Sequence, residues 1–559
     1  MNRSLRHLVA VTTAALTAMC ALPAVADTGS STNAFGKINH IVVIYEENHS
    51  FDNLYGGWEG VNGRANADPS HTLQIGQGGL TYACLQQDDV NFASPQLPAT
   101  CNDTTTATPF SSAFTNQPFG IEAYIPASAK TCPQAGASFP AGSSLPSPNN
   151  LAGGCTRDIV HRFYQEQFQL NNGAQNRYVT GSDAVGLTMG YYDTTGLPIY
   201  AYLHSPAHPH YAIADDFFQA AFGGSFLNHQ WLIAAASPTY PGGPTPQHSI
   251  LDTNGMPNNY PQYAATTGVA DKPLTQQCGL ATTDPKVACG DYAVNTIQPT
   301  YQPTSSNPLK LPPQTGKTIG DELSGAGVSW GWYSGGWSNA DGDVGAPGWT
   351  NGTTPGVCGD PYSFANPTYP YCPNKVFQFH HQPFNYFAAY APGTAGRTHL
   401  QDEQAFTDLA NASSTDCKLN SVSFIKPIGL ENEHPGYTSE TRGSDHLVQL
   451  LQAIQNSSCR QDTMVVVTYD EFGGQWDHAT PPGQGGISGN HDQWGPGTRV
   501  PALVIAPRLQ GNFVVDHTQY DTTSILATIE HRYGLAPLGP RDGAVNDLSS
   551  VFVAAPPFD

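Results

Sequence analysis

Short runs of apolar, mostly β-branched residues recur along the chain and are its strongest structural signal. Continuous apolar runs of this length, without polar alternation, are typical of strands that are buried on both faces of a sheet. The sequence predicts buried strands at 38–45, 328–333, 422–426, 464–469 and 500–506.

Between these strands, apolar positions spaced by three and four residues predict helices. The expected helices span 50–55, 158–171, 206–220, 225–236, 318–323, 444–455 and 521–533. Helices that alternate with buried strands favour an α/β fold, with a mainly parallel central sheet and helices on both faces.

Two long segments, near 57–155 and 237–315, break this alternation. Both are polar and rich in Gly, Pro, Thr and Gln, so they are predicted to be loop-rich insertions. Because the two pairs of candidate metal ligands described below, at 47–48 and 470–471, lie near opposite ends of the chain, residues 27–559 are expected to form a single domain that carries these insertions.

The first 26 residues have the pattern of a secretory signal peptide. A basic start and a short apolar core precede Ala24-Val25-Ala26, so cleavage is expected before Asp27. No other segment reaches the roughly 18 apolar residues that a membrane span requires. A periplasmic or secreted protein without a stable membrane anchor is expected.

The cysteine count agrees with export. Of the 11 cysteines, Cys20 belongs to the signal peptide, and an even number remains, which favours disulfides in an oxidising compartment. Buried free thiols are the alternative. The sequence does not fix connectivity, but five local loops are plausible, at 84/101, 132/155, 278/289, 358/372 and 417/459.

The formal net charge of −22 argues against a nucleic-acid partner, because an acidic surface repels phosphate backbones. A phosphate-bearing substrate remains compatible with this charge, since a bound cation reverses the local sign.

Hard oxygen ligands follow two of the predicted strands directly. Glu47 and Asn48 come after the first strand, and Asp470 and Glu471 come after the strand 464–469. Chemistry in an open α/β sheet lies beyond the carboxyl ends of the strands, so these residues suggest a site for one divalent metal ion of unknown identity. The alternatives are a helix cap at Asn48 and a plain strand-end turn at 470–471.

Ser225 is the candidate nucleophile. It follows Gly223-Gly224 at a predicted helix start, where free amide groups and the helix dipole favour an alkoxide or a phosphate oxygen. A plain capping serine is the alternative on local grounds. Asn228 fits two roles equally, binding a phosphoryl oxygen or capping a loop.

Several histidines stand in unusual sequence surroundings and form a further group of candidates. An imidazole can stabilise a phosphoryl oxygen or protonate a leaving group, although each histidine taken singly is more often a surface or core residue. The candidates are His161, which is expected on the helix 158–171, and His380, His381 and His434.

Six motifs, in order between residues 40 and 506, resemble one bacterial phosphoesterase family: HIVVIYEENHSFDNLYG, FGGSFLNHQWL, FHHQPFNYF, ENEHPG, TYDEFGGQWDHATPP and VPALVIAP. That family joins acid phosphatases to phospholipases C and is similar in fold to alkaline phosphatase and the arylsulfatases. The resemblance implies an alkaline phosphatase-like fold for this chain.

The resemblance also implies a role for each candidate. Ser225 would be the nucleophile, and its oxygen would complete a metal shell formed by Glu47, Asn48, Asp470 and Glu471. The four histidines would surround the phosphoryl group. The acid phosphatases carry two aspartates where this chain has Asp470-Glu471, and the phospholipases often carry Asp-Glu there; the phospholipases commonly have Thr where this chain has Ser225.

These inferences predict a secreted, metal-dependent phosphomonoesterase, similar to acid phosphatases, that works through a phosphoserine. A phospholipase C-type phosphodiesterase acting on phosphatidylcholine is the first alternative. A non-catalytic phosphate- or metal-binding protein is the second. The expected partner is a small phosphate ester or a phospholipid, and the sequence leaves the oligomeric state open.

Overall fold

The structure is a computed structural model that describes residues 35–87, 98–123, 158–240, 251–266, 274–275, 292–294, 311–350 and 377–557. The predicted signal peptide lies outside these residues. So do six of the cysteines in the predicted pairs: Cys132, Cys155, Cys278, Cys289, Cys358 and Cys372.

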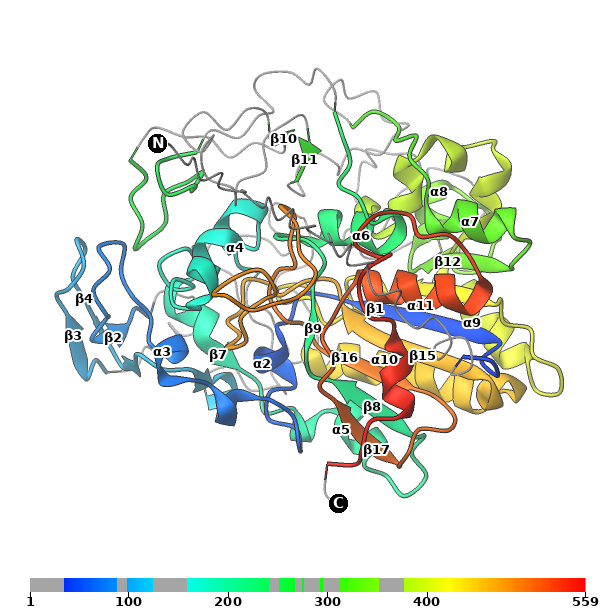
Figure 1. The fold of residues 1–559 in the computed structure, drawn as a ribbon, viewed down its shortest axis with the longest axis horizontal. Helices are drawn as coiled ribbons and strands as arrows, with labels where there is room; N and C mark the ends of the chain where they lie inside the picture. Colours follow the sequence, from blue (N-terminus) through cyan, green and yellow to red (C-terminus); the bar gives the residue numbers. More distant parts are fainter. Residues whose placement is uncertain are drawn as a thin grey trace, which may run out of the picture.

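Among the described residues, eight strands form the central sheet (Figure 1). Their spatial order is β13 (Leu400–Gln401), β12 (Trp330–Ser334), β14 (Val422–Lys426), β1 (His40–Glu46), β15 (Thr463–Tyr469), β16 (Ala502–Ile505), β8 (Tyr211–Ala214) and β17 (Phe513–Asp516). Only β16 runs against its neighbours within this described sheet. The predicted α/β class with a mainly parallel sheet is confirmed.

The centre of the sheet consists of β14, β1 and β15, whose residues are almost all buried. β1 pairs with β15 in parallel from His40 opposite Thr463 to Glu46 opposite Tyr469. The two strands therefore end at the same level. Residues that follow each strand emerge side by side at one edge of the sheet.

Helices cover both faces of this sheet. Consecutive residues of a strand point to opposite faces. Tyr45 donates a hydrogen bond to Asn228 O of α6 (Ser225–Ala234), whereas the charge of the next residue, Glu46, acts on His446 of α10 (Glu440–Gln455). The helices α6 and α10 therefore lie on opposite faces.

The remaining helices gather around these two. Helix α10 contacts α5 (Pro198–Leu203) and α9 (Glu403–Ala412), while α6 contacts α7 (Ile319–Gly325) and α11 (Thr523–Tyr533). Further short helices are α2 (Phe51–Leu54), α3 (Pro69–Thr72), α4 (Phe163–Leu170) and α8 (Trp337–Asp341). None of the helices in the described part of the chain has the length and apolar character to cross a membrane.

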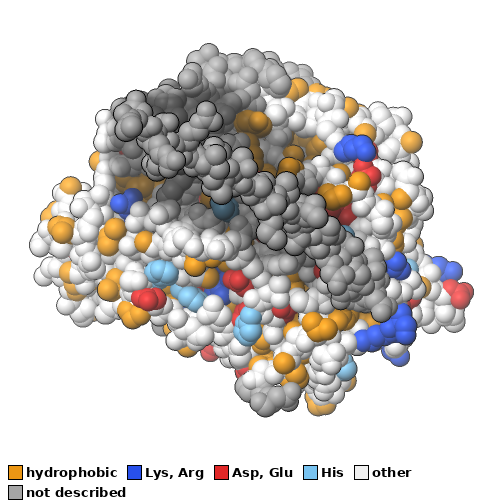
Figure 2. Space-filling model, viewed as in Figure 1, with side chains coloured by type: hydrophobic (Ala, Val, Ile, Leu, Met, Phe, Trp, Pro, Cys, Tyr) orange, Lys and Arg blue, Asp and Glu red, His pale blue; other side chains and the backbone are white. Residues whose placement is uncertain are grey.

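The described part of the first insertion contains short strands tied by the Cys84–Cys101 disulfide. These strands are β2 (Cys84–Leu85), β3 (Cys101–Asp103), β4 (Phe110–Ser112), β5 (Phe114–Thr115) and β6 (Phe119–Gly120), which pairs with β7 (Gly190–Tyr191). Most of β2 to β4 projects at the left of Figure 1. The outer face in Figure 2 shows few charged side chains, as expected when only 12% of residues are charged.

The predicted helix at 206–220 is wrong, because that segment forms β8 and β9 (Phe217–Phe218). All four residues of β8 are buried between β16 and β17. A short apolar run that is buried on all sides has no periodicity to distinguish a strand from a helix. The short strand β9 pairs with β18 (Tyr520–Asp521), and a further pair joins β10 (Leu274–Thr275) to β11 (Tyr292–Ala293).

The predicted helix at 158–171 begins five residues later than expected, at Phe163, so His161 lies in a loop and not on a helix. The amide of Val160 donates to Asp183 Oδ1 (2.8 Å), and Arg162 is extended. This hydrogen bond, from the backbone of Val160 to a side chain in a distant loop, replaces the first helical turn.

Candidate functional site

The four predicted oxygen ligands meet at the carboxyl edge of the sheet. Glu47 and Asn48 follow β1, and Asp470 and Glu471 follow β15. The amide of Asp470 donates to Glu46 O (3.1 Å), and the amide of Asn48 donates to Asp470 Oδ1 (3.1 Å). All four side chains are buried. The parallel register places two segments more than 400 residues apart in direct contact.

Ser225 is brought to the same point by the start of α6. Its hydroxyl donates to Glu47 Oε2 (3.3 Å). The turn before it requires glycine: Gly223 has φ +89°, and a Cβ added there would lie 2.4 Å from the backbone nitrogen of Phe163. The glycine turn therefore lets the chain pass close to α4 and enter α6 with Ser225 beside the carboxylates.

The side chain of Asn228 holds this turn together. Its Oδ1 accepts from the amide of Ala221 (2.9 Å), and its Nδ2 donates to the carbonyl oxygens of Ala221 (3.0 Å) and Gly223 (3.2 Å). The structure thus places Asn228 in the loop-capping role. Its predicted contact with a phosphoryl oxygen stays a prediction.

A cavity of about 460 Å³ opens above Ser225. All four predicted histidines line it together with Ser225. The other side chains of its wall that carry polar groups are Asp158, Arg162, Asp183, Asn258, Tyr260, Gln378 and Tyr437. Sequence segments around residues 160, 225, 380 and 434 therefore converge on one polar space.

The histidines face the carboxylates from several directions. His381 Nε2 lies 2.9 Å from Glu47 Oε1, and His434 Nε2 lies 3.9 Å from Glu47 Oε2. His161 Nε2 lies 3.5 Å from Glu471 Oε1 and 3.4 Å from Asn48 Nδ2. Burial lowers the pKa of His380 and His434, and lowers that of His381 to about 4. These three rings are therefore neutral at neutral pH.

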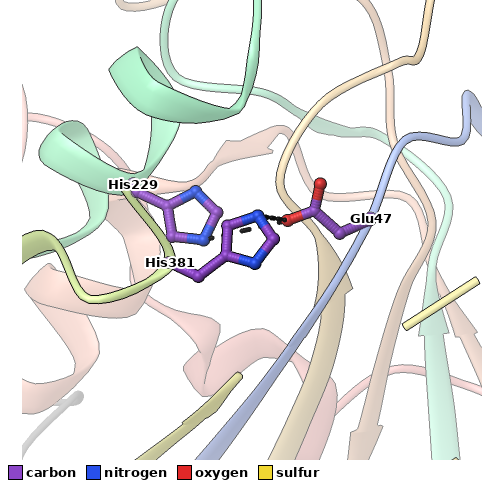
Figure 3. Close-up of side chains that lie close together, drawn as sticks. All are labelled: Glu47, His229 and His381. Atoms are coloured by element: carbon purple, nitrogen blue, oxygen red, sulfur yellow. Dashed lines mark ion pairs between the residues drawn. The ribbon is translucent and has the colours of Figure 1, made fainter. Parts of the chain in front are cut away.

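Two further residues contact Glu47 and were not identified from the sequence. Lys426 ends β14, pairs with Glu47 and donates to Tyr45 O (2.8 Å). The sequence signal that could have identified Lys426 was its position at the end of the apolar strand run 422–426. His229, one helical turn after Ser225, stacks on His381 with ring centroids 5.2 Å apart, and both rings reach toward Glu47 in Figure 3.

The carboxylates differ in their electrostatic surroundings. Burial favours the neutral form of Glu47, but the nearby His381 and Lys426 outweigh it and hold the pKa of Glu47 well below its usual range. Burial and the charge of Glu47 raise the pKa of Asp470 well above its usual range. Burial and the charge of Asp470 do the same to the pKa of Glu471. Ionisation of all three carboxylates therefore requires positive charge beyond that of their protein neighbours.

The residues present fit a hard divalent cation. Within the described residues, Asn48 Oδ1, Asp470 Oδ2 and Glu471 Oε1 are buried without a hydrogen-bond partner. Buried polar atoms of this kind are rare in folded proteins unless something binds them. Carboxylate and amide oxygens are the ligands that hard divalent ions prefer. The predicted ligand set is therefore compatible with a metal ion.

Comparison with known proteins shows which family the chain belongs to. The model of the Phosphoesterase family matches residues 38–536. Phospholipase C A of Mycobacterium tuberculosis (strain ATCC 25618 / H37Rv) is 25% identical over 551 residues, which cover 93% of this chain and 78% of that protein. The non-hemolytic phospholipase C of Pseudomonas aeruginosa is 29% identical over 167 residues, covering 25% of this chain and 24% of that protein.

Among solved structures, a protein in the alkaline phosphatase superfamily from Vibrio parahaemolyticus is 15% identical and covers 45% of this chain and 56% of that chain, with a TM-score of 0.24. A likeness this distant does not bear on the site. The match of the family model over residues 38–536, together with the similarity to a phospholipase C over 93% of this chain, identifies the family and the class of enzyme. The chain belongs to the Phosphoesterase family and is a phosphoric ester hydrolase.

Proposed function

We propose that this protein is a metal-dependent phosphomonoesterase in which Ser225 accepts the phosphoryl group. The observation that carries the proposal is the position of the Ser225 hydroxyl. It lies at a helix start, within hydrogen-bond distance of Glu47, and lines a polar cavity with four histidines. A nucleophile needs both activation and an open approach for the substrate, and this position offers both.

Glu47, Asn48, Asp470 and Glu471 would hold one divalent ion beside the Ser225 oxygen. A bound ion would supply positive charge that lowers the pKa of the hydroxyl and stabilises charge on the phosphoryl oxygens. The unpartnered oxygens of Asn48, Asp470 and Glu471 support this assignment.

The side chains of the cavity perform the remaining tasks. Glu47 orients the Ser225 hydroxyl through their hydrogen bond. The N-terminus of α6 points its dipole at the incoming phosphoryl group, and the neutral ring of His380 can donate one hydrogen bond to it. The single N–H of His381 faces Glu47 Oε1 and that of His434 faces Pro435 O, so these two rings position the neighbouring groups instead. His161 retains 14% exposure of its side chain and is the cavity histidine placed to exchange a proton with the leaving group.

The reaction proceeds in two displacements. The Ser225 oxygen attacks phosphorus as the hydroxyl proton leaves to solvent, the bond to the leaving alkoxide breaks, and that alkoxide takes a proton from His161 or from solvent. Water then attacks the phosphoserine from the opposite side, and inorganic phosphate departs as the serine hydroxyl reforms. A polar cavity of about 460 Å³ suits a small hydrophilic phosphate ester.

A phospholipase C activity is the second candidate. Similarity to phospholipase C A of Mycobacterium tuberculosis over 93% of the chain favours it. The Asp470-Glu471 pair points the same way, whereas Ser225 at the nucleophile position favours the phosphatase. We also propose export to the periplasm or medium, which the Cys84–Cys101 and Cys417–Cys459 disulfides support.

The test compares p-nitrophenyl phosphate, bis-p-nitrophenyl phosphate and phosphatidylcholine vesicles as substrates. We expect fastest turnover of the monoester. Replacing Ser225 with Ala should lower kcat by about 10³-fold or more, and should abolish the labelled phosphate that acid quenching traps on the protein. Ser329→Ala, an exposed serine at the other end of the sheet, is the matched control.

Each contrary result has a clear meaning. Faster turnover of the vesicles would establish the phospholipase. Absence of turnover with every ester, despite bound metal, would indicate a binding protein. Substantial activity in the Ser225→Ala variant would overturn the covalent role.

A further inference from the structure

The carboxyl edge of the sheet holds a second cavity, distinct from the one above Ser225. It measures about 330 Å³ and lies beyond the ends of three parallel strands. Its wall includes Gly335 directly after β12, Asp402 directly after β13, and Ile428 two residues after β14. Ligands of open α/β sheets bind at such positions, outside the carboxyl ends of the strands.

Three side chains that can bind a metal line this cavity. Glu403 is the first residue of α9, Glu431 follows β14, and His446 belongs to α10. One potential ligand atom from each lies within 4.8 Å of the others. His446 Nε2 is 2.6 Å from Glu403 Oε1, and His446 Nδ1 is 3.8 Å from Glu431 Oε2. The imidazole thus lies between the two carboxylates, and the three groups are close enough together for one cation to bind them.

An independent observation shows that the group is incomplete as it stands. Glu403 is only 7% exposed, and its Oε2 is buried without a hydrogen-bond partner among the described residues. A Cβ added to Gly335 would lie 3.4 Å from this oxygen and 2.7 Å from Ile428 N, so only glycine leaves the space open. A buried carboxylate oxygen that lines a cavity without a partner points to a missing ligand.

The local charge favours a cation as that ligand. The fully buried Glu46 also acts on His446, and within the described part of the chain neither of its carboxylate oxygens has a hydrogen-bond partner. A proton on His446 contributes one positive charge against the two carboxylates of Glu403 and Glu431. Arg442 approaches Glu431 to 3.8 Å where both side chains are 34% exposed, so solvent weakens its effect inside the cavity.

We propose that Glu403, Glu431 and His446 form a second binding site for a divalent cation. Two carboxylates and an imidazole suit Zn²⁺ or Mn²⁺ better than Ca²⁺ or Mg²⁺, which prefer oxygen ligands alone. The site goes beyond the proposed phosphatase chemistry, because none of its three residues lines the cavity of Ser225.

The position of the proposed cation indicates a structural role. The cation joins the loops after β13 and β14 to helix α10 and lies behind the catalytic site. Glu46 lies on the His446 side of the sheet and Glu47 faces Ser225, because consecutive residues at the end of β1 point to opposite faces. The second cation therefore stabilises the backbone that carries Glu47, without contacting the substrate.

The test measures Zn²⁺ binding to the full mature chain after treatment with a chelator. Calorimetric titration and metal analysis after gel filtration should give one more equivalent of Zn²⁺ for the wild type than for Glu403→Gln or His446→Gln. Asp408→Asn, an exposed carboxylate on the same helix α9, should bind as the wild type does. Turnover of p-nitrophenyl phosphate should persist in Glu403→Gln.

Equal Zn²⁺ binding by the wild type, Glu403→Gln and His446→Gln would overturn the proposal. A proton on His446 would then be the charge that holds the imidazole and the two carboxylates together. If circular dichroism shows that both variants fail to fold, anomalous scattering from a Zn²⁺-soaked crystal of the wild type decides. A peak among the three side chains supports the site, and no peak overturns it.

The Asp470→Asn variant separates this site from the catalytic one. It should lose activity and keep the equivalent that Glu403→Gln loses. An inactive wild type that still shows this extra equivalent would refute the phosphatase and leave the second cation site standing.

Discussion

A single buried lysine connects two strands of the sheet, β14 and β1, to the candidate site. Lys426 Nζ pairs with Glu47 and donates to Tyr45 O (2.8 Å) and Glu46 O (3.2 Å), and none of the side chain is exposed. The ammonium group is therefore the local counterion of Glu47. Removing one member of a buried ion pair leaves the other charge uncompensated, which costs far more than losing an exposed pair.

We expect Lys426→Met to lower the free energy of unfolding by about 3–5 kcal/mol in the metal-free protein. Urea denaturation in the presence of a chelator measures this loss. Lys317→Met is the control, because Lys317 pairs with Glu322 but its side chain is 76% exposed; it should produce no measurable change. Equal effects of the two substitutions would show that burial does not strengthen the contribution of Lys426.

At the level of elements, the central strands were predictable and their neighbours less so. The runs at 422–426 and 464–469 became β14 and β15 within one residue, because a continuous buried strand leaves a plain apolar signature. That signature also led directly to Glu47, Asn48, Asp470 and Glu471 as the residues beyond the strand ends.

Other features depend on tertiary contacts that the sequence does not express. The direction of β16 depends on the path of the chain before it, and a strand pattern reads the same in both directions. His161 leaves the predicted helix because Asp183, in a distant loop, binds the amide of Val160. His229 looked like an ordinary helix residue, since only the fold places His381 against it.

Helix α4 is tied to the turn before Ser225 by one carboxylate, Glu166. This fully buried side chain accepts hydrogen bonds from the amides of Gly223 (2.5 Å) and Thr498 (2.7 Å). Burial raises the pKa of Glu166 to about 7, although these hydrogen bonds act in the opposite direction. In the unfolded chain a glutamate ionises near pH ~4.3.

The folded protein therefore holds this proton more tightly than the unfolded chain does. The resulting stability is fully present below about pH 4 and is lost as the pH rises through about 7. Glu166→Gln cannot ionise, so the wild type should lose stability relative to this variant between these pH values. Urea unfolding of both proteins across this range measures the difference, and a constant difference would contradict the raised pKa.

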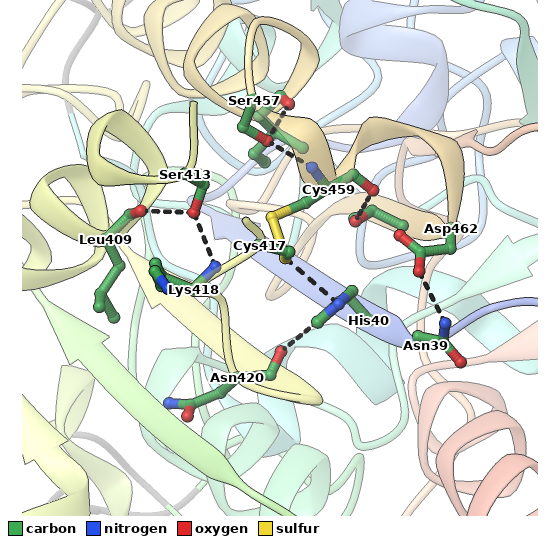
Figure 4. Close-up of a disulfide and its surroundings, with 12 residues drawn as sticks. Asn39, His40, Leu409, Ser413, Cys417, Lys418, Asn420, Ser457, Cys459 and Asp462 are labelled. Atoms are coloured by element: carbon green, nitrogen blue, oxygen red, sulfur yellow. Dashed lines mark hydrogen bonds between the residues drawn. A yellow bond between two sulfur atoms is a disulfide. The ribbon is translucent and has the colours of Figure 1, made fainter. Parts of the chain in front are cut away.

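For the whole molecule, the Cys417–Cys459 disulfide secures the edge of the sheet opposite the site. It joins the segments that lead into β14 and β15, and Cys417 Sγ lies 3.2 Å from His40 Nε2 at the start of β1 (Figure 4). The amino ends of the three central strands are thus held together, while their carboxyl ends carry the candidate ligands.

Replacing both cysteines with serine should lower the free energy of unfolding by about 4 kcal/mol, because the bond closes a loop of 42 residues. Denaturant unfolding measures this value. The kcat of the folded variant should match the wild type, since the site lies at the other edge. The Cys84–Cys101 disulfide closes a loop of 17 residues. Replacing both of these cysteines with serine should lower the free energy of unfolding by about 3 kcal/mol. A large loss of kcat without unfolding would refute the separation of the two edges.

Metal removal should affect both activity and stability of the whole molecule. Asp470 and Glu471 are buried beside Glu47 and have oxygens without a hydrogen-bond partner in the described residues, so a bound cation would stabilise the folded state over the unfolded one. At a metal concentration of about 100 times Kd, this linkage amounts to about 2.7 kcal/mol. A chelator should therefore abolish turnover and lower the Tm, and added metal should restore both. In Asp470→Asn the chelator should lower the Tm by less than in the wild type. Unchanged turnover and Tm after verified metal removal would exclude a metal at this edge.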